Sequence, residues 1–226
     1  MENNIIKEDY KYLSTLIILF FTILFANNAV VYKLVEISSY KVSAASLIYP
    51  ITYLITGIIA EVYGYKTAKK LIWQSVVMNI VFSGLISALI LLPSPKEWVF
   101  QSSFLIVYND ITLNSIVHGI TAPLSYFINA YLISKWKVYF AGKYFGVRSI
   151  ASSIIGEFIF SLIMVPFVWY GNKLNFILPL ILITFSTKII WAVLGSYLAV
   201  IAVDYLKKSE KVDIYDNGII FNPFKI

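Results

Sequence analysis

A series of long apolar runs, repeated from near the N-terminus almost to the C-terminus, restricts the fold of this chain more than any other feature. Six runs can be distinguished, and each is close to or above the roughly 20 residues that a helix needs to cross a membrane. They cover residues 12–34, 44–64, 68–92, 111–134, 147–170 and 176–205. Only 13% of the residues are charged, about half the usual share in soluble domains. The sequence therefore predicts an all-α integral membrane bundle of six transmembrane helices.

The runs are treated as one transmembrane domain over residues 1–226, ending in a polar cytoplasmic tail at 206–226. The first run is longer than the apolar part of a cleaved signal peptide and follows acidic residues, which indicates a retained helix. Within the tail, Asn217-Gly218 could make the turn of a small hairpin, or the tail could be disordered. The chain contains no cysteine, so no disulfide framework is expected.

The basic residues indicate how the helices are oriented. Most of the 18 Lys and Arg residues lie before the first run, after the second, after the fourth and after the sixth. The connections on the opposite side contain only Lys33, Lys41, Lys96 and Lys173. Because short cytoplasmic connections are enriched in Lys and Arg, both termini are predicted to be cytoplasmic in an inner-membrane protein. The net charge of +6 follows this membrane face, so nucleic-acid binding is not expected.

The second run carries a polar stripe. Tyr49, Tyr53, Gly57 and Glu61 follow one another at a spacing of four and share one helical face. Two rings, a gap without a side chain and a carboxylate make a poor lipid-facing surface, but they suit the lining of an enclosed cavity. For Glu61 a plainer alternative stays open, a solvated acid at the helix end close to Lys66.

Two charged residues lie inside other runs, Glu157 in 147–170 and Lys188 in 176–205. A charge near mid-membrane costs on the order of 2–3 kcal/mol or more unless it is paired, protonated or hydrated. The two residues could form a buried ion pair that locks their helices together, or a pair that opens to a ligand or a proton. Both interpretations predict that they lie close together.

Two further polar residues have alternative interpretations. Asn27, near the outer end of the first run, could join helices through its amide or contact a ligand. His118 is the only histidine and is interpreted as a hydrogen-bonded structural residue in preference to a proton relay. With one His and no Cys, neither a metal site nor another cofactor is expected.

Two blocks of sequence carry a family resemblance. YPITYLITGIIAEVYGYKTAKKLIW, residues 49–73, resembles the second-helix signature of the queuosine precursor transporter family of bacterial membrane proteins. RSIASSIIGEFIFSLIMVPFVWYG, residues 148–171, resembles the fifth helix of that family. An Asn at the position of Asn27 and a Lys in the sixth helix also recur there. The resemblance implies six helices and import of a queuosine precursor, a 7-deazaguanine-type base, across the inner membrane.

The chain departs from the family pattern at three acidic positions, which are occupied here by Gly57, Leu132 and Phe160. The loss of these acids implies altered recognition, altered proton coupling or both. One hypothesis is that the chain is a facilitator, which passes the base down its gradient.

The residue types suit a flat base with a donor–acceptor edge. A carboxylate can accept two hydrogen bonds from such an edge, and an aromatic face stacks on a base with about 1–3 kcal/mol. The predicted substrate-binding residues are Asn27, Tyr49, Tyr53, Glu61, Glu157 and Lys188. They are expected to lie between the first, second, fifth and sixth helices.

Several alternatives stay open. The chain could be the substrate-binding subunit of an energy-coupling-factor importer, or a paralogue that acts as a membrane scaffold without transporting. A homodimer is also open. No phosphate loop, no nucleophile–base pair and no metal cluster is recognisable, so an enzyme is not expected. Finally, Pro50 and Pro166 occupy corresponding places in the second and fifth runs, which leaves an inverted three-plus-three repeat open.

Overall fold

The computed structural model describes residues 10–37, 40–108, 111–171 and 173–224. Two of the basic residues used to orient the chain, Lys7 and Lys225, lie outside them. The elements are α1 (Leu13–Val30), β1 (Leu34–Ile37), β2 (Tyr40–Ser43), α2 (Ala45–Ile48), α3 (Pro50–Ile90), α4 (Gln101–Tyr108), α5 (Ile111–Tyr139), α6 (Phe145–Val168) and α7 (Leu174–Glu210). Among the described residues, five helices are long and apolar enough to cross a membrane: α1, the continuous stretch Ala45–Ile90, α5, α6 and α7.

Five such helices occur where six were predicted because α2 and α3 join the second and third apolar runs into one stretch of 46 residues. A straight helix of that length would measure about 70 Å, more than twice the hydrocarbon thickness. The stretch is broken at Gly64, whose backbone angles (φ 80°, ψ 167°) are not helical. A glycine reaches positive φ without the steric cost of a Cβ atom, so the chain can turn here.

The two parts of α3 run in opposite directions along α5. The first part contacts α5 in ascending order, in the pairs Tyr53–Ser125 and Glu61–Lys137. The second part contacts it in descending order, in the pairs Trp73–Phe127 and Asn79–Ser115. The chain therefore reverses at Gly64, and the predicted boundary between the second and third runs lies at this residue. Counting the two oppositely directed parts of α3 separately, the five continuous helices contain six apolar segments, as predicted.

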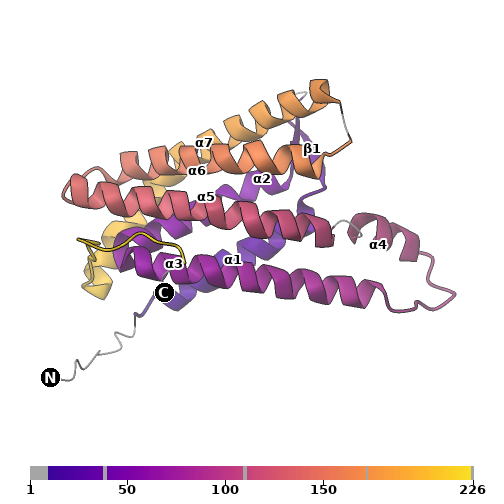
Figure 1. The fold of residues 1–226 in the computed structure, drawn as a ribbon, viewed down its shortest axis with the longest axis horizontal. Helices are drawn as coiled ribbons and strands as arrows, with labels where there is room; N and C mark the ends of the chain where they lie inside the picture. The colour runs from indigo at the N-terminus through magenta and orange to yellow at the C-terminus, as the bar shows by residue number, and fades with distance from the viewer. Residues whose placement is uncertain (1–9, 38–39, 109–110, 172, 225–226) are drawn as a thin grey trace.

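The bundle has two distinct ends (Figure 1). At one end, which we call the hairpin end, β1 and β2 pair antiparallel, with Leu34 opposite Ser43. At the other end, which we call the tail end, lies the segment 211–224. The prediction of an all-α bundle is thus correct for the membrane segments, but it missed this short hairpin. The Ser43 hydroxyl donates a hydrogen bond to the Val31 carbonyl (2.6 Å) and ties β2 to the end of α1.

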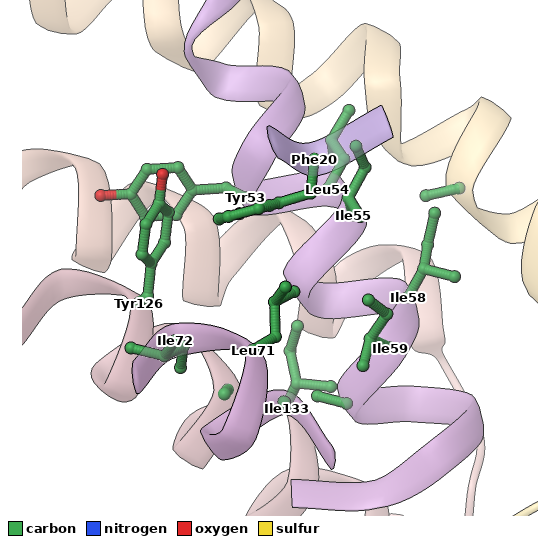
Figure 2. Close-up of a cluster of buried hydrophobic side chains, with 14 of the residues drawn as sticks. Phe20, Tyr53, Leu54, Ile55, Ile58, Ile59, Leu71, Ile72, Tyr126 and Ile133 are labelled. Atoms are coloured by element: carbon green, nitrogen blue, oxygen red, sulfur yellow. The ribbon is translucent and has the colours of Figure 1, made fainter. Parts of the chain in front are cut away.

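The core lies where α1 and α5 meet both parts of α3 (Figure 2). These three helices contribute the buried side chains of Phe20, Tyr53, Leu54, Ile55, Ile58, Ile59, Leu71, Ile72, Tyr126 and Ile133, and α6 and α7 add further members such as Phe160 and Val203. The Ile133 side chain packs closely against Gly57 in this cluster. A Cβ atom there would lie 2.8 Å from Ile133 Cδ1, too close for van der Waals contact.

The tail at 211–224 is an ordered part of the bundle, so the prediction of a disordered tail or a hairpin is wrong. Residues 217–218 do form a turn, but no strand flanks it within 211–224. Among the hydrogen bonds that bind the tail are Ile214 N to Val62 O (3.2 Å), Tyr65 N to Asp216 Oδ2 (2.8 Å) and Trp73 Nε1 to Pro223 O (2.8 Å). Since the first N–H groups of a helix lack intrahelical partners, the Asp216 carboxylate caps α3 where it resumes after Gly64.

Replacing Gly64 should destabilise the protein. In Gly64→Ala the new Cβ atom would meet Ile214 Cγ2 at 2.9 Å, on a backbone with φ 80°. Strain of this kind costs on the order of 1–3 kcal/mol, measurable as a lowered free energy of unfolding in detergent. Gly84→Ala is the matched control, because a Cβ atom at Gly84 would meet nothing within 4 Å. Equal stability of the two variants would contradict the role of Gly64 as the reversal point.

Candidate functional site

A small cavity lies toward the hairpin end, enclosed by α1, α2, β2, α5, α6 and α7. Its volume is about 60 Å³, which is room for a few water molecules. The polar and aromatic side chains that line it are Asn27, Ser43, Ser46, Tyr49, His118, Phe160, Trp169, Thr184 and Lys188. Met164 and several aliphatic side chains complete the wall.

A buried ion pair stands at this cavity. Lys188 Nζ lies 2.6 Å from Glu157 Oε2, and each side chain is only 2% exposed. The ion pair that the sequence predicted is therefore present. Lys188 lines the cavity and Glu157 does not, so the charge presented to a bound solute is the ammonium group. Direct contact of the Glu157 carboxylate with a base stays a prediction.

An aromatic wall faces the same space. The rings of Tyr49 and Phe160 are stacked, with centroids 4.6 Å apart and planes at 29°. The ring of His118 meets both edge-on, at 5.6 and 5.8 Å. Lys188 Nζ lies 4.3 Å from the Phe160 centroid and 5.3 Å from that of Tyr49. A cation over an aromatic face gains up to about 2 kcal/mol when desolvated, so the rings share with Glu157 the stabilisation of the ammonium group.

Four polar atoms around the cavity have no hydrogen-bond partner among the described residues. They are Asn27 Oδ1, Tyr49 OH, His118 Nε2 and Lys188 Nζ. The contact of Lys188 with Glu157 is close, but it lacks the directed geometry of a hydrogen bond. Each unsatisfied buried group costs about 1–3 kcal/mol, and such groups in native proteins are normally bound to water or a ligand. The cavity therefore gathers four kinds of polar group: the amide oxygen of Asn27, the phenol of Tyr49, the imidazole nitrogen of His118 and the ammonium group of Lys188. Such an arrangement can bind a polar, flat solute.

The structure places some of the predicted site residues at the cavity and others away from it. Asn27, Tyr49 and Lys188 line the cavity, and Glu157 contacts it through Lys188. Tyr53 does not line it: its hydroxyl donates to Ser125 Oγ (2.6 Å). Its ring packs on that of Tyr126, with centroids 4.8 Å apart; both rings are drawn in Figure 2.

Glu61 is not part of the cavity either. It lies twelve residues beyond Tyr49 on the same helix, which places it about 18 Å further toward the tail end.

The lining residues outside the predicted set include His118, Phe160 and Thr184. The sequence favoured a structural role for His118, and the structure places it at the cavity with Nε2 unpartnered among the described residues. Phe160 follows Glu157 by three residues and Thr184 precedes Lys188 by four. Residues three or four apart share a helical face, so this spacing was the available signal. At Phe160 an aromatic ring stands under the ammonium group, where the family pattern has an acid.

The tail end is closed by a cluster of charged side chains around Glu61. Glu61 is fully buried and accepts two hydrogen bonds from the Arg148 guanidinium, at 2.8 and 3.2 Å. Lys207 Nζ adds a third contact at 2.9 Å. A bidentate guanidinium–carboxylate pair is among the strongest polar contacts in proteins. The alternative of a solvated acid beside Lys66 is therefore wrong.

The C-terminal tail completes this cluster. Asp213 forms ion pairs with Lys137 and with Lys207, the latter at 2.9 Å. Lys137 also donates to the backbone carbonyls of Glu61 and Ile214. Partial burial acts to raise the pKa of Asp213, but the hydrogen bonds from Lys137 and Lys207 outweigh it and hold the pKa below its usual value. Asp213 is thus ionised at neutral pH and holds the tail over the end of the bundle.

A helical bundle that encloses a polar, aromatic cavity at a buried ion pair defines a class of multi-pass membrane proteins that handle a small solute. A family model described as "Putative vitamin uptake transporter" matches residues 43–203. The chain belongs to this family, which confirms the resemblance of its two sequence blocks to queuosine precursor transporters. The match runs from the end of β2 through most of α7 and covers every cavity residue except Asn27 and Val31. No curated protein and no solved structure matches the chain.

The buried pair generates a stability prediction. Glu157→Gln leaves an unpaired ammonium group and Lys188→Met leaves an unpaired carboxylate, so each should lower the free energy of unfolding by about 3–5 kcal/mol. The double variant leaves no unpaired charge and should lose less than the sum of the two single variants. Denaturant unfolding of all four proteins in detergent measures this coupling. Strictly additive losses would show that the two side chains do not interact.

Proposed function

We propose that this chain imports a queuosine precursor, or a related nucleobase-like compound, across the inner membrane. The observation that carries the proposal is the cavity, where stacked rings, three polar atoms without a partner among the described residues and a buried ion pair occur together. The family match supports uptake of a small solute, and the residues of the cavity favour a flat heteroaromatic one.

The chemistry of a 7-deazaguanine base suits these groups. Its ring carbonyl can accept a hydrogen bond from Lys188 Nζ, and its amino and ring N–H groups can donate to Asn27 Oδ1. Its faces can stack on Tyr49 or Phe160, a contact worth about 1–3 kcal/mol. The cavity of about 60 Å³ is smaller than the roughly 300 Å³ or more of typical ligand pockets. We therefore propose that the base enters by separating the Tyr49–Phe160 stack and replacing one ring as the partner of the other.

The two ends suggest how access alternates. The cavity is lined by Ser43 and Trp169 from the hairpin end, whereas the cluster of Glu61, Arg148 and Lys207 closes the tail end. We propose that the tail end faces the cytoplasm, since the basic connections and the C-terminal tail gather there. The structure then corresponds to a state closed toward the cytoplasm, and release of the base requires the Glu61 cluster to separate.

We also propose that transport is facilitated diffusion. Gly57 and Phe160 stand where the resembled family pattern has acids, and a side chain at position 57 would require the end of the Ile133 side chain to move. The carboxylate that remains near the cavity, Glu157, is held by Lys188. A proton carrier needs a carboxylate that is free to titrate as the cavity changes sides. Uptake into proteoliposomes that requires an imposed proton gradient would count against this.

The function can be tested in bacteria that cannot make the precursor. Expression of this chain should restore queuosine in tRNA when a 7-deazaguanine base is supplied at low concentration, and mass spectrometry of tRNA nucleosides measures it. Lys188→Gln and Tyr49→Ala should reduce the restored queuosine at least tenfold at equal protein level, because each removes a proposed contact with the base.

The matched control for these variants is Lys135→Gln, which removes a basic side chain exposed at the tail end and should transport normally. Wild-type chain that is present in the membrane and restores no queuosine with any precursor base would contradict the proposed substrate.

A further inference from the structure

A second hollow lies on the outside of the bundle, between the second part of α3 and the C-terminal tail. Its volume is about 900 Å³, far larger than the internal cavity. Lys66, Lys69 and Lys70 line one end of this groove, and Val77 and Met78 line the other. The tail contributes Ile219 and Ile220. A cationic end and an apolar end therefore occur in one groove.

Two lysines of the cationic end, Lys66 and Lys70, have no ion-pair partner among the residues that the structure describes. Both side chains are exposed. Lys137 and Lys207 at the same end of the bundle are, in contrast, paired with Glu61 and Asp213. The groove thus presents excess positive charge that an anionic partner can balance.

The apolar end continues the lipid-facing surface of α3. Val77 is 54% and Met78 44% exposed, and Val81 and Leu85 extend the same outward surface along the helix. Lys70 precedes Val77 by seven residues and Lys66 precedes it by eleven, spacings that place all three on one helical face. A molecule that filled the groove would have a negative group at the lysines and a long apolar part along α3.

The rim on the tail side is fixed in place. Trp73 Nε1 donates to the Pro223 carbonyl at 2.8 Å, and the Phe221 ring packs between Tyr65 and Tyr131, with centroids 5.0 Å from each. Ile220, by contrast, is 67% exposed beside the groove. An occupant would therefore touch α3 and the tail together.

We propose that this groove binds one acidic phospholipid, whose phosphate lies among Lys66, Lys69 and Lys70 and whose acyl chain lies along Val77 and Met78. Basic side chains at a membrane surface attract acidic lipids, and the apolar wall excludes a purely ionic ligand. The bound lipid joins α3 to the tail that covers the Glu61 cluster. This site is independent of the solute that the internal cavity carries.

The test is thermal unfolding of the full chain in detergent, with dioleoyl-phosphatidylglycerol added in increasing amounts. The acidic lipid should raise the melting temperature saturably, while dioleoyl-phosphatidylcholine and free glycerol 3-phosphate should not. The triple variant Lys66→Gln, Lys69→Gln, Lys70→Gln should bind the acidic lipid roughly a hundredfold more weakly, as expected for the loss of three charges near a headgroup.

The matched control is the triple variant Lys135→Gln, Lys143→Gln, Lys208→Gln, which removes the same charge from exposed lysines at the same end but outside the groove. It should keep the response of the wild-type chain. The proposal is overturned if both triple variants lose the response equally or if both keep it. Equal stabilisation by phosphatidylcholine, or by glycerol 3-phosphate alone, would overturn it as well.

Discussion

The contact between Glu157 and Lys188 is the interaction on which the rest of the structure depends. Two opposite charges, each 2% exposed, can remain in an apolar bundle only while they face each other and have polar or aromatic neighbours. That requirement holds α6 and α7 in register and keeps the rings of Tyr49 and Phe160 beside the ammonium group. It also leaves hydrogen-bonding capacity on Lys188, so the group that stabilises the bundle is available to a solute.

The bundle separates its polar groups by depth. Near the hairpin end they are few, largely unpartnered and gathered around a cavity. At the tail end they are numerous and mutually satisfied: one carboxylate, Glu61, is bound by Arg148 and Lys207, and Asp213 brings the tail into the same network. The buried ionic cluster is strong and holds the tail end closed, whereas the unpartnered groups at the cavity gain from binding a polar solute. Both properties suit the alternating-access carrier proposed above.

The apolar runs could be predicted because hydropathy is a property of each local stretch of sequence. The ion pair could be predicted because a buried charge is costly and needs an opposite charge beside it. The reversal at Gly64 could be located only approximately, since glycine is also tolerated within membrane helices. The ordered tail could not be predicted: it is bound through Asp213, Asp216 and Pro223, whose partners Lys137, Tyr65 and Trp73 lie 76 or more residues away in the sequence. Only some of the residues that line the cavity could be predicted from the sequence. Asn27 and Lys188 stood out as polar residues in apolar runs, whereas Phe160 looks like any lipid-facing ring until α5 and α7 are placed around it.

The central claim is that a solute binds beside the buried pair and reaches it from the hairpin end. The chain contains no cysteine, so a single Thr184→Cys variant reports on the cavity directly through its reaction with a membrane-impermeant maleimide. A Ser209→Cys variant marks the side of the membrane at which the tail end lies. The account predicts that Thr184→Cys is labelled faster from the other side, and that a 7-deazaguanine base slows this labelling. Labelling from the same side as Ser209→Cys, or at a rate that the base leaves unchanged, would contradict it.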